Sequence, residues 1–189
     1  MTKKRIDIKK SHWAILSVCI FFLCLVAGCT ESENNEKGDD FSFTTLDNTI
    51  KHLRDYRDKA VILDMWATWC TPCAYQMIEL QKTHDHYETD DLVILSVDID
   101  SRESPSDIQQ FMENLRNTYG VTLDWIFGMD DGTIWSRYQL SGGIPTLCIF
   151  DQEGTLIFSH EGVCIFDETP LGYPEDLTRL RPILDDIIG

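Results

Sequence analysis

The chain has 189 residues, of which 43% are hydrophobic and 25% are charged, so it is long enough for one packed domain and a little more. Its formal net charge at pH 7 is −16, and its first 28 residues hold five of the 16 basic residues but one of the 32 acidic residues. The rest of the chain therefore has 11 basic and 31 acidic residues, a net charge of −20, which excludes nucleic acid and anionic lipid surfaces as ligands.

The N-terminal segment has the pattern of an export signal. Residues 3–12 are rich in lysine and arginine, and residues 13–27 form an apolar run that only Ser17 interrupts. That length suits the core of a signal peptide and is short for a membrane span. We therefore expect residues 1–28 to be a signal peptide, with an uncleaved N-terminal membrane anchor as the alternative. Both place the rest of the chain outside the cytoplasmic membrane.

The sequence Leu-Val-Ala-Gly-Cys at 25–29 resembles the lipobox of prokaryotic lipoproteins. The resemblance implies that the Cys29 thiol receives a diacylglyceryl group and that the chain is cut before it, and two acyl chains give stable anchoring. Residues 29–40 are otherwise polar, so we expect a disordered tether that carries lipidated Cys29. A folded domain over residues 41–189 would then be held by its lipid at the extracytoplasmic face of the membrane.

Hydrophobic patterning predicts strands that alternate with helices in this domain. Strands are expected at residues 41–46, 60–65, 92–98, 123–127, 146–150 and 155–160. Helices are expected at residues 71–88, 104–118, 133–140 and 175–188, and a short link with helical character at residues 50–59. This order predicts an α/β fold with a mixed central sheet flanked by helices on both faces.

A pair of cysteines separated by two residues opens the helix expected at residues 71–88, within Trp-Ala-Thr-Trp-Cys-Thr-Pro-Cys at 66–73. Such a dithiol can close into a disulfide and reopen. With Gly-Ile-Pro-Thr at 143–146, the arrangement resembles the thioredoxin superfamily. Cys73 and Pro145 are 72 positions apart, which leaves room for a central strand and helix that a minimal thioredoxin lacks. That insertion, an N-terminal strand and the lipoprotein signal together resemble the TlpA/ResA-like branch of membrane-anchored thiol–disulfide oxidoreductases.

The positions of the two cysteines relative to the helix suggest a different role for each thiol. A thiol attacks a disulfide only as the thiolate, and a helix N-terminus stabilises that negative charge. We therefore expect Cys70 to be the exposed nucleophile and Cys73, one turn further along, to be the resolving thiol. The resemblance implies a cis peptide bond before Pro145 and a substrate that docks against the backbone of Ile144. The side chains expected around this docking surface are Trp69, Thr71 and Pro72, whereas Trp66 suits a core position.

Asp64 interrupts the apolar strand expected at residues 60–65, six positions before Cys70. Thioredoxin has an aspartate at this place that assists proton transfer to the inner thiol, and the resemblance implies the same proton relay here. The alternative is an aspartate that a nearby lysine or the backbone satisfies, with no catalytic part. ResA-like proteins usually have a glutamate three residues after the second cysteine, where this chain has Gln76.

The leading functional hypothesis is a reductase for disulfides of exported proteins, such as apocytochromes c, supplied with electrons by an upstream membrane thiol donor. It needs no cofactor beyond the redox-active Cys70–Cys73 pair. No metal is expected, because zinc needs a second ligand pair and Cys148 and Cys164 are isolated. Cys148 suits a buried apolar position, and Cys164 could be a loop thiol open to oxidation. The alternatives are a peroxiredoxin-like thiol peroxidase, with Thr68 before the attacking cysteine, and a non-catalytic docking domain.

Overall fold

The computed structural model describes residues 39–87, 89–172 and 174–189. The expected signal peptide, Cys29 and most of the expected tether lie outside these residues, so those assignments stay predictions. Within the described ranges, no helix is long and apolar enough to cross a bilayer. The last two residues of the expected tether contact the domain, since the Asp39 N–H donates to the Gly154 carbonyl and Asp40 pairs with Arg54.

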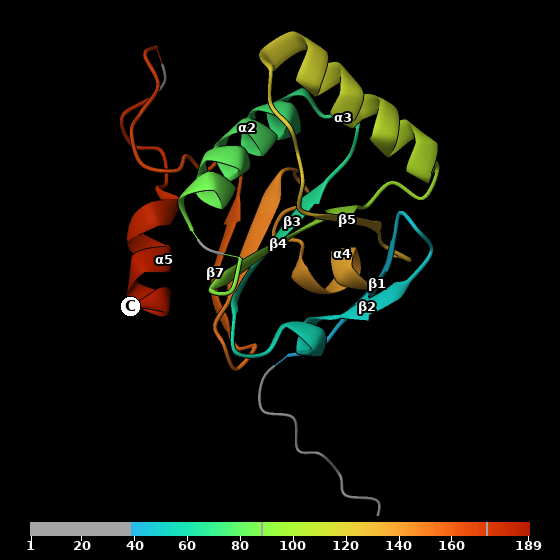
Figure 1. The fold of residues 1–189 in the computed structure, drawn as a ribbon, viewed down its shortest axis with the longest axis horizontal. Helices are drawn as coiled ribbons and strands as arrows, with labels where there is room; N and C mark the ends of the chain where they lie inside the picture. The colour runs from blue at the N-terminus through green and yellow to red at the C-terminus, as the bar shows by residue number, and fades with distance from the viewer. Residues whose placement is uncertain (1–38, 88, 173) are drawn as a thin grey trace, which may run out of the picture. The chain divides into compact units, whose positions relative to one another are not determined.

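A mixed sheet of seven strands forms the centre of the described domain (Figure 1). The strands are β1 (Ser42–Thr45), β2 (Ile50–His52), β3 (Ala60–Trp66), β4 (Leu92–Asp98), β5 (Ile126–Met129), β6 (Thr146–Phe150) and β7 (Leu156–Glu161). They lie in the order β2-β1-β5-β4-β3-β6-β7. β3, β4 and β5 are parallel, and β1, β6 and β7 pair with their neighbours antiparallel. Every residue of the central strand β3 is buried, which explains its nearly uninterrupted apolar sequence.

Helices cover both faces of the sheet, as the alternating pattern predicted (Figure 1). One face packs against α2 (Thr71–His86), α3 (Pro105–Tyr119) and α5 (Leu180–Ile188), and the other against α4 (Thr133–Tyr138) and the 3₁₀ turn η2 (Leu53–Tyr56). Alternate residues of β3 separate the two cores, with Ile62 in the cluster of α2 and α5 and Leu63 in the cluster of α4. The segment between α2 and β6 holds β4, α3, β5 and α4, so the extra strand and helix inferred from the spacing are present.

The last helix is shorter than expected, beginning at Leu180 instead of near residue 175. The residues before it are tied to the chain that follows β7, because Ile165 bridges to Arg179 and the Arg179 guanidinium donates to the Asp167 carbonyl and the Thr169 hydroxyl. Tertiary contacts therefore hold residues 177–179 outside the helix, after a turn at residues 175–176, in a path that their local sequence does not specify.

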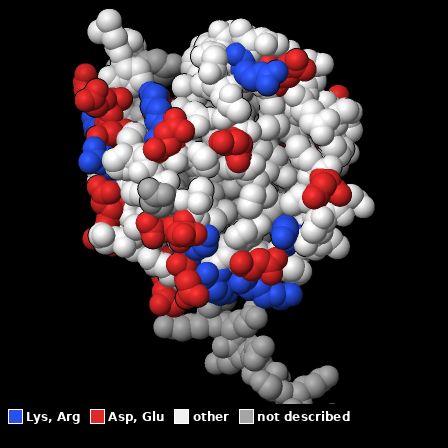
Figure 2. Space-filling model, in the orientation of Figure 1, with Lys and Arg blue, Asp and Glu red and all other residues white. Residues whose placement is uncertain are grey.

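Two other elements also differ from expectation. Residues 50–59 contain the edge strand β2 before the turn η2, in which Leu53 is buried. β5 begins at Ile126, three residues later than predicted, because Leu123 packs under α3 and the Trp125 indole turns inward to Ser96. On the face in Figure 2, acidic and basic side chains lie in separate groups, one acidic group near the centre, with uncharged surface between them.

Candidate active site

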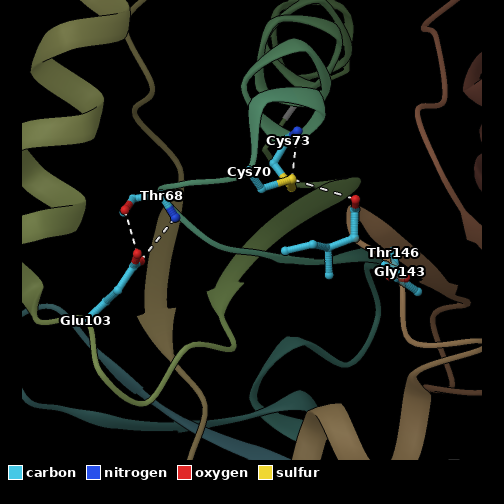
Figure 3. The surroundings of a disulfide bond; sticks show 7 residues. Thr68, Cys70, Cys73, Glu103, Gly143 and Thr146 are labelled. Atoms are coloured by element: carbon cyan, nitrogen blue, oxygen red, sulfur yellow. Dashed lines mark hydrogen bonds between the residues drawn. A yellow bond between two sulfur atoms is a disulfide. The ribbon is translucent and has the colours of Figure 1, made fainter.

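The two cysteines of the motif form a disulfide at the N-terminus of α2, with their Cα atoms 5.2 Å apart (Figure 3). Cys70 is the N-cap residue, and its Sγ atom accepts a hydrogen bond from the Cys73 N–H at 3.2 Å. Pro72 stands in the first turn, where its missing N–H is not needed. Cys70 is 4% exposed and Cys73 is 0% exposed, so both residues are buried in the disulfide form, and Cys70 is not the exposed residue that the sequence predicted. Thr71 is exposed beside it.

The cis-proline loop faces the disulfide. The Ile144–Pro145 peptide bond is cis, as the sequence predicted, and the Ile144 carbonyl oxygen lies 3.6 Å from the Cys70 Sγ atom (Figure 3). Pro145 is buried and its carbonyl accepts from the Gly162 N–H at 2.8 Å, while Ile144 is half-buried. The loop therefore places the main-chain carbonyl of Ile144 beside the Cys70 sulfur.

A glutamate that the sequence did not single out holds this loop. Glu161, the last residue of β7, accepts hydrogen bonds from the N–H and hydroxyl of Ser141 and from the Gly143 N–H. These bonds, first that of the Ser141 hydroxyl, lower the pKa of the Glu161 carboxyl below its usual range. Glu161 pairs in register with Thr146, and this pairing brings it to the loop. No local pattern reveals such a contact between residues about twenty positions apart.

Asp64 lies on β3 beneath α2, fully buried. Burial raises the pKa of its carboxyl to about 7, and the hydrogen bond that Oδ2 accepts from the Ser96 hydroxyl at 2.9 Å acts in the opposite direction. The Ser96 Oγ atom is also 3.8 Å from the Met77 Sδ atom, one helical turn after Cys73. Asp64 therefore lies under the face of α2 that carries the inner cysteine, with a pKa suited to proton exchange near neutrality.

Two carboxylates that follow β4, those of Glu103 and Asp100, hold the turn that precedes Cys70. Glu103 accepts from the Thr68 N–H at 3.0 Å and from the Thr68 hydroxyl at 2.6 Å (Figure 3). Asp100 accepts from the Trp69 indole N–H at 2.8 Å, so this side chain, 61% exposed, has a fixed orientation at the surface. Asp98 is buried beneath them, and burial raises its pKa above the usual range. No sequence pattern indicated this cluster, because its members meet Thr68 and Trp69 only in the fold.

The remaining cysteines of the described residues are buried and unpaired. Burial raises the pKa of both Cys148 and Cys164 to about 12, so neither is a reactive thiol at neutral pH. This corrects the idea that Cys164 is open to oxidation, since it is 0% exposed. Its N–H and carbonyl bond the side-chain amide of Gln76, at 2.8 and 3.1 Å. Trp66 is a fully buried core residue, and the described chain has no cluster of metal-ligating side chains.

Comparison with known proteins adds independent information. A profile described as the AhpC/TSA family matches residues 35–159. Thioredoxin-like protein YneN of Bacillus subtilis is 30% identical over 131 residues, 69% of this chain and 72% of that protein. Thiol-disulfide oxidoreductase ResA of Bacillus cereus is 25% identical over 185 residues, 96% of this chain and 100% of that protein. The crystal structure of the pneumococcal exposed lipoprotein thioredoxin Etrx1 of Streptococcus pneumoniae matches with a TM-score of 0.53 and 26% identity, covering 66% of this chain and 90% of that one.

Proposed function

Because the chain belongs to the AhpC/TSA family and is a thiol–disulfide oxidoreductase of the ResA type, we propose that it reduces disulfides of exported proteins at the outer face of the cytoplasmic membrane. The observation that carries the proposal is the disulfide at the N-terminus of α2, with Cys70 facing the main chain of the cis-proline loop. This places a reactive sulfur next to main-chain groups that can hold an extended partner.

The proposed reaction starts from the reduced protein. The Cys70 thiolate attacks one sulfur of the partner disulfide, so that a mixed disulfide forms and the other partner sulfur leaves as a thiolate. Cys73 then loses its proton to the Asp64 carboxylate and attacks the Cys70 Sγ atom. The Cys70–Cys73 bond forms, the bond to the partner breaks, and the partner leaves as a dithiol. Two electrons have passed to the partner, and an upstream membrane thiol donor restores the dithiol.

A carboxylate beside the nucleophile supports reduction as the direction. Glu103 holds Thr68, two residues before Cys70, so its negative charge disfavours the Cys70 thiolate, whereas the charge of Asp100, which holds Trp69, is balanced by an ion pair with Arg102. A dithiol whose thiolate is less stable gives up its electrons more readily, because strong oxidants are those whose reduced form is stabilised. The Cys73 N–H and the helix N-terminus still favour the thiolate enough for attack.

The N-terminal sequence supports the proposed compartment. The lipobox-like segment ending at Cys29 predicts a lipid anchor, and the Etrx1 structure is described as an exposed lipoprotein. The natural partners we propose are exported proteins that carry disulfides, with apocytochromes c as one candidate. Exposed Trp69, Thr71 and Pro72 and the main chain of Ile144 would form the docking surface.

The peroxidase alternative has less support. It needs a threonine that serves the attacking cysteine, whereas the Thr68 hydroxyl donates to Glu103 and Cys70 is already paired with Cys73. We expect the reduced protein to consume hydrogen peroxide no faster than a free thiol does. A docking domain without activity is not supported either, because the relatives are thiol–disulfide oxidoreductases.

Reduction of insulin by dithiothreitol tests the activity. The wild-type domain is expected to accelerate insulin precipitation, and Cys70→Ser is expected to lose the acceleration. The control is Cys148→Ala, which removes a buried thiol on the other face of the sheet and should keep it. Equal rates for Cys70→Ser and wild type would overturn the proposal.

Trapping in cells tests the partner and the compartment. Cys73→Ala lacks the resolving thiol, so it should hold its partners as mixed disulfides through Cys70 that mass spectrometry can identify. The control is the double variant Cys70→Ala/Cys73→Ala, which should hold none. Exported or membrane proteins are expected in the trap, and recovery of cytosolic proteins alone would refute the assigned compartment.

A further inference from the structure

Three side chains form a hydrogen-bonded chain behind the dithiol. The Trp125 indole N–H donates to the Ser96 Oγ atom at 3.0 Å, and the Ser96 hydroxyl donates to the Asp64 Oδ2 atom at 2.9 Å. Ser96 on β4 and Asp64 on β3 are register partners, and both are fully buried. The half-buried Trp125 indole stacks on Phe127, with ring centroids 5.5 Å apart, so its position is fixed by packing. These hydrogen bonds therefore connect the half-buried indole of Trp125, through Ser96, to the buried carboxyl of Asp64.

The direction of this chain follows from the groups that make it. An indole N–H can only donate, so the Ser96 oxygen must accept from Trp125. The single hydroxyl proton of Ser96 then goes to Asp64, because its other neighbour, the Met77 sulfur at 3.8 Å, is a weak acceptor. Asp64 Oδ2 is therefore held as an acceptor.

The second oxygen of the same carboxyl is in a different situation. Asp64 Oδ1 is buried and has no hydrogen-bond partner among the described residues. A buried oxygen without a partner is uncommon in folded proteins and calls for a reason. Since Ser96 occupies Oδ2, a proton taken up by the carboxyl resides on Oδ1.

Few groups that titrate face Asp64. On α2, Cys73 lies one turn before Met77, which contacts Ser96. The segment after β7 contributes Cys164, a buried thiol whose pKa is raised mainly by burial and further by Asp64. The register neighbours on β4 and β6 are Ser96 and Leu147, which do not titrate in this range. No lysine or arginine among the described residues pairs with Asp64, so the hydrogen bond from Ser96 is its principal polar support.

We propose that Ser96 and Trp125 are positioning residues that direct the proton of Asp64 to Oδ1 and thereby set the pH at which Cys73 is activated. The inference rests on the proposed function, in which Asp64 accepts the Cys73 proton. In that step the Cys73 S–H bond breaks and an O–H bond forms at Oδ1. The Cys73 thiolate then attacks Cys70, and the partner sulfur leaves with the electron pair of the mixed disulfide.

Two measurements on the same variants test the role of the Trp125–Ser96–Asp64 hydrogen bonds. The first is the titration midpoint of the Asp64 carboxyl carbon, followed by NMR in the reduced protein. The second is the pH profile for resolution of a preformed mixed disulfide. Removing the Ser96 hydroxyl withdraws support from the carboxylate, so Ser96→Ala should move both midpoints upward by about one pH unit and slow resolution about fivefold at pH 7. Trp125→Phe keeps the stacked ring but loses the N–H. It should therefore move both midpoints upward by less than Ser96→Ala does.

Controls separate this chain from general damage to the core. Ser96→Thr restores a hydroxyl and should return both midpoints to the wild-type values. Trp135→Phe replaces a half-buried indole that packs in the core on the other face of the sheet and should shift neither. An unchanged Asp64 midpoint in both Ser96→Ala and Trp125→Phe overturns the inference. If Asp64→Asn resolves mixed disulfides with the wild-type pH profile, the proton role of Asp64 fails and the inference with it, while dithiol exchange by Cys70 and Cys73 stands.

Discussion

At the scale of single residues, Asp64 is costly to the fold. Its carboxyl is fully buried, it accepts one hydrogen bond from Ser96, and no basic side chain among the described residues pairs with it. Taking a carboxylate out of water without a counter-charge destabilises the folded state. The proposed proton relay to the dithiol gives a reason for an acid at the centre of an apolar strand, which stability does not.

The cost of Asp64 predicts a gain in stability when it is removed. Burial raises its pKa from 3.8 to about 7 in the folded protein, so ionisation destabilises the fold progressively as the pH rises from about 4 to 7. Above pH 7 the full cost persists, and below pH 4 it vanishes. Asp64→Asn should therefore raise the free energy of unfolding at pH 8 by roughly 3–4 kcal/mol and change it little at pH 3.5. Urea unfolding at the two pH values measures this, and equal effects at both would contradict the assigned burial cost.

Glu103 allows a test of whether a nearby negative charge lowers the reduction potential of the Cys70–Cys73 pair. Glu103→Gln removes a negative charge next to Thr68 and replaces one acceptor oxygen with a donor. The Cys70 thiolate should become more stable, so we expect its pKa to fall and the reduction potential to rise by about 10–30 mV. Equilibration with glutathione measures the potential. The matched control is Glu113→Gln, which removes the same charge from an exposed position of α3 and should leave the potential unchanged.

At the scale of elements, the segment after β7 is fixed to α2 by buried polar side chains. Gln76 bonds both the N–H and the carbonyl of Cys164, and the Glu79 carboxylate accepts from the Phe166 N–H at 2.9 Å. This segment also bridges to the residue before α5, so α2 and α5 are linked through it. The helix that carries the dithiol is thus anchored by residues of its second and third turns.

Removal of the Gln76 amide should loosen that anchor. Gln76→Ala leaves two main-chain groups of Cys164 without partners and opens a cavity, so we expect a loss of about 2–4 kcal/mol of unfolding free energy. Gln110→Ala, on the exposed surface of α3, is the control and should cost little. Gln76→Glu should also destabilise the fold at neutral pH, because a carboxylate cannot donate to the Cys164 carbonyl. A stable Gln76→Glu variant would contradict this account.

The sequence predicted the central elements and the dithiol better than the edges and the supporting contacts. β4 and β6 have the expected bounds, because buried strands are strongly apolar over their whole length. β5 and α5 differ because Trp125 and Arg179 make tertiary contacts that fix their neighbours. The cysteine pair and Pro145 stand out by spacing. Glu103, Glu161 and Ser96 reach the site only through strand register and loop paths, which no local pattern encodes.

At the scale of the whole molecule, the dominant feature is negative charge. The chain has a net charge of −16, and its sequence beyond residue 28 has a net charge of −20. A field of this sign attracts cationic partners and repels anionic ones, and salt screens both effects. Figure 2 shows uncharged surface between the charged groups, so the acidic side chains do not cover this face evenly.

This charge predicts a preference among otherwise similar substrates. A disulfide peptide flanked by lysines should be reduced faster than one flanked by glutamates, by about tenfold at 20 mM salt and by less than twofold at 500 mM salt. Stopped-flow kinetics with the two peptides measures the difference. If the rate difference between the two peptides does not change with salt, local contacts and not the overall negative charge determine it, which contradicts this prediction.

In the proposed reaction Cys70 is the sulfur that attacks the partner, and Cys73 reacts only afterwards, with Cys70. The most direct measurement is the alkylation rate of each thiol in the reduced protein between pH 5 and 9, with the modified residue identified by peptide mapping. We expect Cys70 to react first, with a pKa below the value of about 8.5 for a free cysteine, and Cys73 to stay unmodified until the protein unfolds. Modification of Cys73 first, or of neither thiol faster than in an unstructured peptide, contradicts the account.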